Sequence, residues 1–252
     1  AHLHRRGARM IELAWRDRVA ILTLDRPEKH NALTTALCHG IRSALTEAAD
    51  ARVVVITGRG RSFCSGADLD EVYTADFRDA LYAMLHAVAD LPQPVVAAVN
   101  GAAIGAGTQL AIAADFRVVA PAARFAVPTA KIGLAVDPWT IRRLALIAGN
   151  GTARRLLLAC DQLDADAAVA CGLADRAGDT DQALEWALGM TPLAPLTQAY
   201  SKRVLNAVFE PAFDGPPAAE LDAAFEGCWA SEDFAEGRRA RAEKRPPIFR
   251  GR

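Results

Sequence analysis

The chain of 252 residues is 52% hydrophobic and 23% charged, enough to bury the core of one large domain or of one domain with a tail. Its 29 basic and 30 acidic side chains are interspersed and leave a formal net charge of -1, which argues against a nucleic-acid-binding face. The five cysteines are widely spaced and form no CxxC pair, so we expect reduced thiols, no metal site and a cytoplasmic protein. No apolar run approaches the roughly 20 residues of a membrane span. Residues 1–9 (AHLHRRGAR) predict a basic N-terminal extension rather than a signal peptide.

The first part of the chain alternates strand and helix patterns. Apolar runs over residues 11–15 and 19–24 flank a polar turn and predict a β-hairpin. Apolar side chains at helical spacing predict helices over residues 35–49 and 75–89. Between them, RVVVITG (residues 52–58) is typical of a strand that is covered on both faces, and a loop is expected to follow it.

The stretch PVVAAVNGAAIGAGTQLAIAAD (residues 94–115) combines three patterns. Residues 95–99 predict a buried strand, residues 100–107 a tight loop with three glycines, and an Ala-rich segment from Thr108 a helix. Amides at a helix N-terminus have no internal partner and lie at the positive end of the helix dipole, so this loop could hold an oxyanion. The alternative is that the glycines only allow a turn and close packing.

Beyond this stretch the pattern becomes helical. Short strands are predicted over residues 116–120 and 124–126, and almost only helices after Pro138. The expected helices are 139–148, 151–159, 164–171, 181–189, 195–208, 217–230 and 232–243. No GxxxxGK[ST] motif occurs, and Leu110 stands where a dinucleotide fingerprint needs its third glycine, so the usual nucleotide-phosphate loops are excluded. The sequence therefore predicts an αβ core and a helical tail.

Six segments between about Ile11 and Phe249 follow the order and spacing of motifs in one known family. They are LDRPEKHNAL (24–33), VVVITGRGRSFCSGADL (53–69), PVVAAVNGAAIGAG (94–107), AARFAVPTAKIGL (122–134), ARRLLLACDQLDADAAVACGLAD (153–175) and EGRRARAEKRPPIF (236–249). On these motifs the chain resembles the crotonase superfamily, the enoyl-CoA hydratase/isomerase fold. The resemblance implies an α/β spiral of ββα units over residues 10–195. A C-terminal helical region over residues 196–252 is then expected to mediate homotrimers or hexamers.

The resemblance also implies a ligand and an oxyanion hole. Crotonases bind a coenzyme A thioester and point two backbone amides at its carbonyl oxygen, so that charge developing there meets donors already in place. By resemblance, the donors here are the amides of Ala67 and Ala106. Many relatives have Gly at the position of Ala106, but a backbone donor tolerates alanine if φ stays negative. CoA enters as part of the ligand, and no separate cofactor is expected.

The remaining ligand contacts are likewise implied by resemblance. The expected CoA-binding residues are Lys29, His30, Ala32, Ser65, Ala67, Asp68, Leu69 and Lys244. Lys29, His30 and Lys244 could meet phosphates, or could be solvated charges with no partner. Many relatives have Arg in place of His30, so its contact could depend on pH. The family role of Asp68 is structural. Residues 69–89 are expected to form one wall of the acyl pocket, lined by Val72, Tyr73 and Phe77.

The acid and base of the hydratases are missing. Hydration needs one group to take a proton from water and another to deliver a proton to the α-carbon, and hydratases use two glutamates. At the matching positions this chain has Gln109, one turn into the central helix, and Thr129, in FAVPT. An amide and a hydroxyl can position water, but neither exchanges protons near neutral pH. Efficient hydratase activity is therefore not expected.

One carboxylate stands at a suggestive position. Asp137, in KIGLAVDPW, matches a catalytic aspartate of dienoyl-CoA isomerases and aryl-CoA dehalogenases in this superfamily. Its apolar neighbours make a raised pKa plausible. Alternatively, Asp137 and Pro138 form an N-cap and N1 pair for the following helix, and the aspartate does nothing but cap. The two roles can coexist.

The patterns IGAGTQLA and FAVPTAKIGLAVDPWTIRRL resemble those of mycobacterial enoyl-CoA hydratase paralogues that lack the glutamate pair. Two functions stay open. In the first, the protein binds fatty acyl-CoA with little or no turnover and partners with fatty-acid synthesis enzymes. In the second, it is an enoyl-CoA or dienoyl-CoA isomerase that uses Asp137, or a weak hydratase. The missing glutamates favour the first.

Overall fold

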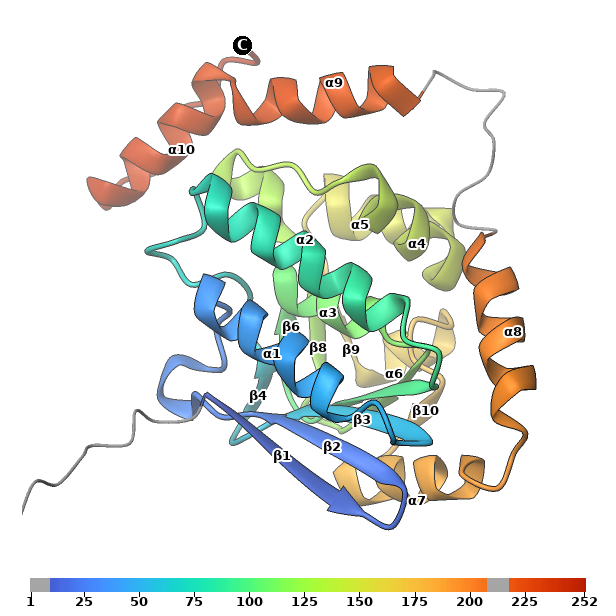
Figure 1. Cartoon of the computed structure of the whole chain (residues 1–252). Helices are drawn as coiled ribbons and strands as arrows, with labels where there is room; N and C mark the ends of the chain where they lie inside the picture. The colour runs from blue at the N-terminus through green and yellow to red at the C-terminus, as the bar shows by residue number, and fades with distance from the viewer. Residues whose placement is uncertain (1–9, 208–217) are drawn as a thin grey trace, which may run out of the picture.

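The computed structural model describes residues 10–207 and 218–252 and contains two sheets (Figure 1). The strand order is β1-β2-β3-β5-β7-β10 in the larger sheet and β4-β6-β8-β9 in the smaller. The strands are β1 (Ile11–Arg16), β2 (Val19–Leu24), β3 (Val53–Gly58), β4 (Ser62–Cys64), β5 (Val95–Val99), β6 (Ala102–Ile104), β7 (Phe116–Val119), β8 (Arg124–Ala126), β9 (Gln162–Asp164) and β10 (Arg176–Ala177).

Helices lie on both faces of the larger sheet, and further helices follow at the C-terminal end of the chain. They are α1 (Thr35–Glu47), α2 (Ala75–Ala89), α3 (Ala106–Ala113), α4 (Pro138–Ala148), α5 (Asn150–Leu158), α6 (Ala165–Ala170), α7 (Thr180–Met190), α8 (Pro195–Ala207), α9 (Ala218–Trp229) and α10 (Glu232–Ala242), with 3-10 helices η1 (Pro27–Lys29) and η2 (Pro128–Ile132). α7 covers one face of the sheet, and α1 and α2 lie on the other side (Figure 1).

The hydrophobic pattern explains the larger sheet. β1 and β2 form the predicted antiparallel hairpin, and β3 pairs in parallel with both β2 and β5. Every residue of β3 and β5 is buried, as their continuous apolar runs predict for strands covered on both faces. The predicted α/β spiral with a helical C-terminal region is confirmed, whereas the boundary between residues 195 and 196 stays a prediction.

The smaller sheet was only partly predicted. β4 and β6 lie where loops were expected, and β9 and β10 interrupt the expected helical tail. These strands have two or three residues, too few to show a period. They form because each finds a neighbour to pair with: β4 pairs with β6, β6 with β8, β9 with β8, and β10 with β7 of the larger sheet. The helix expected from Thr108 begins at Ala106, two residues earlier. That difference makes Ala106 the first helical residue.

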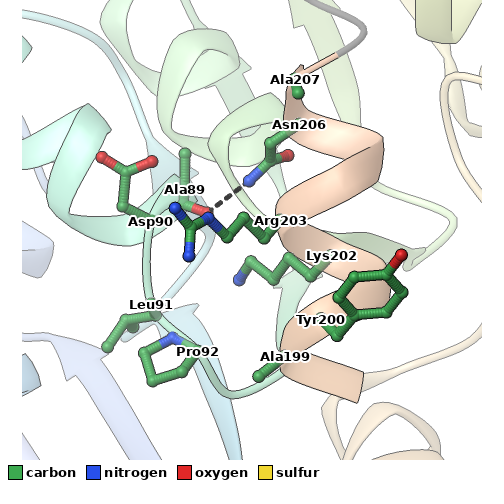
Figure 2. Close-up of a pocket in the computed structure, with 10 residues that line it drawn as sticks. All are labelled: Ala89, Asp90, Leu91, Pro92, Ala199, Tyr200, Lys202, Arg203, Asn206 and Ala207. Atoms are coloured by element: carbon green, nitrogen blue, oxygen red, sulfur yellow. Dashed lines mark hydrogen bonds between the residues drawn. The ribbon is translucent and has the colours of Figure 1, made fainter. Parts of the chain in front are cut away.

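The C-terminal helices are attached to the core at separate places. On α8, the buried Lys202 ammonium lies 2.7 Å from the Asp115 carboxylate. On the same helix, the Asn206 amide donates to the Ala89 carbonyl at 2.9 Å (Figure 2). On α10, a Cβ at Gly237 would lie 2.2 Å from the Ile132 carbonyl oxygen, so glycine lets α10 approach η2 closely. The predicted extension over residues 1–9 and the ends of two predicted helices, at residues 208 and 217, lie outside the described residues. Within the described residues, no helix has the length and apolar composition of a membrane span.

Candidate functional site

Two backbone amides that the sequence marked as oxyanion donors have no partner in the fold. Around Ala67, the bonds to Leu33 use the Gly66 carbonyl and the Asp68 amide, at 2.8 and 2.6 Å, and leave the Ala67 amide unused. Ala106 is the first residue of α3, so its amide has no intrahelical acceptor. Across residues 10–207 and 218–252, neither amide donates a hydrogen bond.

Gly66 brings the two amides to one place. Its φ of +105° is a conformation that favours glycine, and a Cβ there would lie 2.8 Å from the Ile104 carbonyl oxygen. The same Cβ would lie 3.8 Å from the Ala106 nitrogen, so the chain next to Ala67 passes directly beside the start of α3. Unpaired N–H groups at a helix N-terminus favour an anionic or polarised oxygen.

A cavity of about 230 Å³, here called the acyl cavity, opens beside these amides. Ala67 and Ala106 both line it, together with Ser65 and Leu69 from the motif SGADL. Its wall is largely apolar and includes Val72, Phe77, Leu81, Leu134 and Val136. The volume lies below the range of about 300–1,000 Å³ that is usual for drug-sized ligands, so a short acyl chain fits it best.

The polar lining of the acyl cavity includes the two residues that the resemblance puts at the positions of the acid and the base. Gln109 and Thr129 both line it, with Gln109 only 3% exposed. None of the described residues that line this cavity is Asp, Glu or His. Proton transfer by a carboxyl or imidazole group in direct contact with a ligand therefore has no group to carry it here.

Asp137 forms the helix cap that its sequence predicts. Its side chain accepts a hydrogen bond from the Thr140 backbone amide at 3.2 Å, and α4 begins at Pro138. Burial raises the pKa of Asp137, and the bonds from Thr140 oppose that rise. Asp137 does not line the acyl cavity, although its neighbour Val136 does. The cap is therefore confirmed, and a catalytic role for Asp137 stays a prediction.

The loop predicted to meet CoA is held together by an arginine that was not singled out from the sequence. Arg26 forms an ion pair with Asp68 at 3.2 Å and donates to the Ala32 carbonyl. Asp68 thus ties this loop to Arg26, and its contact with CoA stays a prediction. Lys29 and His30 are exposed at the end of η1, where their side chains are open to a ligand.

Lys244 lies apart from this loop, just beyond α10. It is exposed, does not line the acyl cavity, and adopts a φ of 52°. The turn after it is closed by Arg245, which contacts the buried Glu236 carboxylate at 2.6 Å. These bonds hold the pKa of Glu236 at about 2, so the turn that carries Lys244 stays ordered by an ionised carboxylate across the usual pH range.

The far wall of the acyl cavity differs from the expectation at one position. Tyr73 does not line the cavity, because its ring packs on Phe234 of α10 with centroids 5.3 Å apart. Tyr82, Arg78 and Trp229 line it instead.

Arg78 and Trp229 belong to α2 and α9, two helices that lie far apart in the chain. The Arg78 guanidinium lies 5.0 Å from the Trp229 ring centroid and 3.0 Å from the Glu226 carboxylate. This contact seats α9 over the cavity. The sequence does not predict this contact between α2 and α9, because an apolar period describes one helix by itself and does not show which helices meet.

The fold, the paired amides and the apolar cavity together define a protein of the crotonase type, and comparison with known proteins gives the same family. The model of the enoyl-CoA hydratase/isomerase family matches residues 15–252, and the chain belongs to that family. Among the described residues, no group of His, Cys, Asp or Glu side chains could hold a metal ion.

Similar proteins include several from mycobacteria. The chain is 44% identical to the probable enoyl-CoA hydratase echA6 of Mycobacterium tuberculosis, over 96% of this chain and all of that protein. A solved structure of EchA1_1 from Mycobacterium paratuberculosis superimposes with a TM-score of 0.81 at 34% identity, covering 98% of this chain and 100% of that one. A methylmalonyl-CoA decarboxylase shares the fold, with a TM-score of 0.89 at 21% identity over 96% of this chain and 99% of that one.

Proposed function

We propose that this protein binds acyl-CoA thioesters and hydrates enoyl-CoA little or not at all. One observation carries the proposal: the amides of Ala67 and Ala106 are unpaired at an apolar cavity whose described lining contains no carboxylate. The thioester oxygen would accept from both amides, and the acyl chain would enter the cavity. The geometry that stabilises a transition state in an enzyme would here contribute to affinity.

The rest of the ligand would follow the surface. In this proposal the CoA phosphates meet Lys29 and His30, with Lys244 reaching the ligand of its own or a neighbouring subunit. Exposed apolar side chains on α8, such as Leu196 and Tyr200 at 84% and 69% exposure, support a homo-oligomer, a trimer or a hexamer. A cytoplasmic location and a partnership with fatty-acid synthesis enzymes remain part of the proposal.

Removing one donor tests the oxyanion hole directly. Ala106→Pro deletes the amide N–H at the first helical position, where proline is tolerated and no backbone bond is lost. Titration calorimetry with butyryl-CoA should show about a tenfold loss of affinity, the effect of one hydrogen bond to a polarised oxygen. The affinity for free CoA, which has no thioester carbonyl, should stay unchanged.

Ala106→Gly is the matched control, because it alters the same side chain and keeps the N–H. Its affinity for butyryl-CoA should equal that of the wild type within about threefold. If the wild type binds neither butyryl-CoA nor palmitoyl-CoA, the proposed function is wrong. Equal affinities in the proline and glycine variants would remove Ala106 from the oxyanion hole.

Isomerisation of an unsaturated acyl-CoA by Asp137 is a second candidate. The observation that favours it is the burial that raises the pKa of this carboxyl, which suits a proton carrier. If it is correct, 3-enoyl-CoA and 3,5-dienoyl-CoA should be converted, and Asp137→Asn should lower the rate about 10²-fold or more. Chromatography of the CoA esters measures this. Conversion that the variant leaves untouched would exclude Asp137 from the chemistry.

A further inference from the structure

Among the described residues, the lining of the acyl cavity carries one charged side chain, that of Arg78. Its neighbours in the wall are apolar or aromatic and include Phe77, Leu81 and Trp229. The Arg78 side chain is 19% exposed, so most of it is shielded from water. A cation in such a wall attracts an anion more strongly than a cation in bulk water does, because its surroundings screen the charge less.

Two aromatic rings of α9 hold this cation in place. The central carbon of the Arg78 guanidinium group lies 5.0 Å from the Trp229 ring centroid and 5.8 Å from the Phe225 ring centroid. A guanidinium group stacks through its face, which leaves the N–H groups along its edges for hydrogen bonds. The side chain is therefore held before a ligand arrives, and little of its freedom is lost on binding.

One edge of the guanidinium group makes no hydrogen bond. The Nη1 atom donates to the Glu226 carboxylate at 3.0 Å, whereas the Nε atom lies 3.9 Å from the Asp79 carboxylate, beyond hydrogen-bond distance. Nε and Nη2 donate to no described residue, and neither belongs to the fully buried polar atoms, so both stay accessible. These two N–H groups form an edge that can bind both oxygens of one carboxylate.

The two carboxylates nearest to Arg78 do not neutralise it inside the cavity. The side chains of Glu226 and Asp79 are 59% and 77% exposed, so water and salt screen them. Neither residue lines the acyl cavity. The Trp229 Nε1–H group beside Arg78 is buried and has no acceptor among the described residues. This part of the wall thus has donors and a positive charge in excess.

We propose that Arg78 binds a carboxylate at the far end of the acyl chain, so that the protein takes short dicarboxylic acids as their CoA monothioesters. The inference rests on the proposed function, in which the thioester oxygen accepts from the amides of Ala67 and Ala106. A carboxylate only accepts hydrogen bonds and carries the opposite charge, whereas a terminal methyl group would leave the guanidinium edge unpaired. The acyl cavity, of about 230 Å³, has room for a short chain.

Pairs of ligands with equal numbers of carbons test this: succinyl-CoA with butyryl-CoA, glutaryl-CoA with valeryl-CoA, and adipyl-CoA with hexanoyl-CoA. Titration calorimetry on the full-length protein should show at least one dicarboxylic ligand, whose chain reaches Arg78, binding about tenfold more tightly than its partner. Arg78→Met keeps a long side chain and should reverse the preference, since the carboxylate then meets an apolar wall. Arg42→Met removes an exposed arginine of α1 that does not line the acyl cavity, and should keep it.

Glu226→Gln separates recognition from a purely structural role of Arg78. It removes the same ion pair between α2 and α9 but leaves the positive charge in the wall. If Arg78 only seats α9, Glu226→Gln and Arg78→Met should change the preference alike. If Arg78 binds the carboxylate, Glu226→Gln should raise the preference for the dicarboxylic ligand by up to about threefold, because a competing carboxylate is gone.

Equal binding within every pair by the wild type, or matching effects of the two variants, would overturn the inference while leaving the proposed function standing. If no acyl-CoA binds, both fall.

Discussion

Gly107→Ala is expected to lower the free energy of unfolding by at least about 3 kcal/mol. The alanine Cβ would lie 2.0 Å from the Cys64 carbonyl oxygen and 2.9 Å from its carbon. Both atoms belong to the backbone of β4, so no side-chain rotation relieves the overlap. Either α3 or β4 must shift, and these elements carry Ala106 and the approach to Ala67. The variant should therefore lose acyl-CoA binding together with stability.

Urea unfolding followed by circular dichroism, at one fixed protein concentration, measures this difference. Gly189→Ala is the matched control, because it is an exposed glycine on α7 with no atom within 4 Å of its added Cβ. The control should be neutral or more stable by about 0.5–1 kcal/mol, since alanine is the better helix former. A Gly107→Ala protein that unfolds at the wild-type midpoint would show that β4 and α3 do not pack as described.

The wild-type protein is expected to hydrate crotonyl-CoA at least about 10²-fold more slowly than an active enoyl-CoA hydratase assayed beside it. Loss of one acid or base typically costs about 10²–10⁴ in rate, and the family resemblance puts Gln109 and Thr129, which both line the acyl cavity, at the two positions. The effects of two such losses within one mechanism do not multiply. The hydration rate should therefore be lowered by about as much as the loss of one group alone would lower it. The hydration rate is measured from the decrease in absorbance of the conjugated thioester.

Adding back one carboxylate should not restore the hydration rate. Gln109→Glu supplies one of two groups and places its charge beside the Thr140 hydroxyl, which contacts the Asp137 carboxylate, so that the two carboxylates repel each other. Its rate should therefore stay within about tenfold of the wild type. A wild-type rate within tenfold of the reference hydratase would show that Gln109 and Thr129 do not explain the chemistry, and would contradict the proposed lack of turnover.

Features that depend on neighbours in the chain were predictable from the sequence. The period of apolar side chains placed α2 at its observed bounds, because residues three and four apart share one helix face. The Asp137–Pro138 pair predicted the cap of α4, since an N-cap needs only the amides of the next turn. The six motifs indicated the family, and the resemblance to that family indicated the backbone amides of Ala67 and Ala106 as candidate donors.

Only the tertiary structure decided which distant residues meet. β4 and β6 are too short to have a period and form because each finds a pairing partner. The same holds for Gln109 on α3, which bonds to Thr140 of α4 and lines one cavity with Tyr82 of α2, because α3 packs against both of the other helices. Tyr73 turned toward Phe234, while Trp229 joined the cavity wall, since α9 and α10 fold back over α2. Local spacing determines an element and its caps, whereas a cavity is made by side chains from several elements, and their order along the chain does not encode their distances.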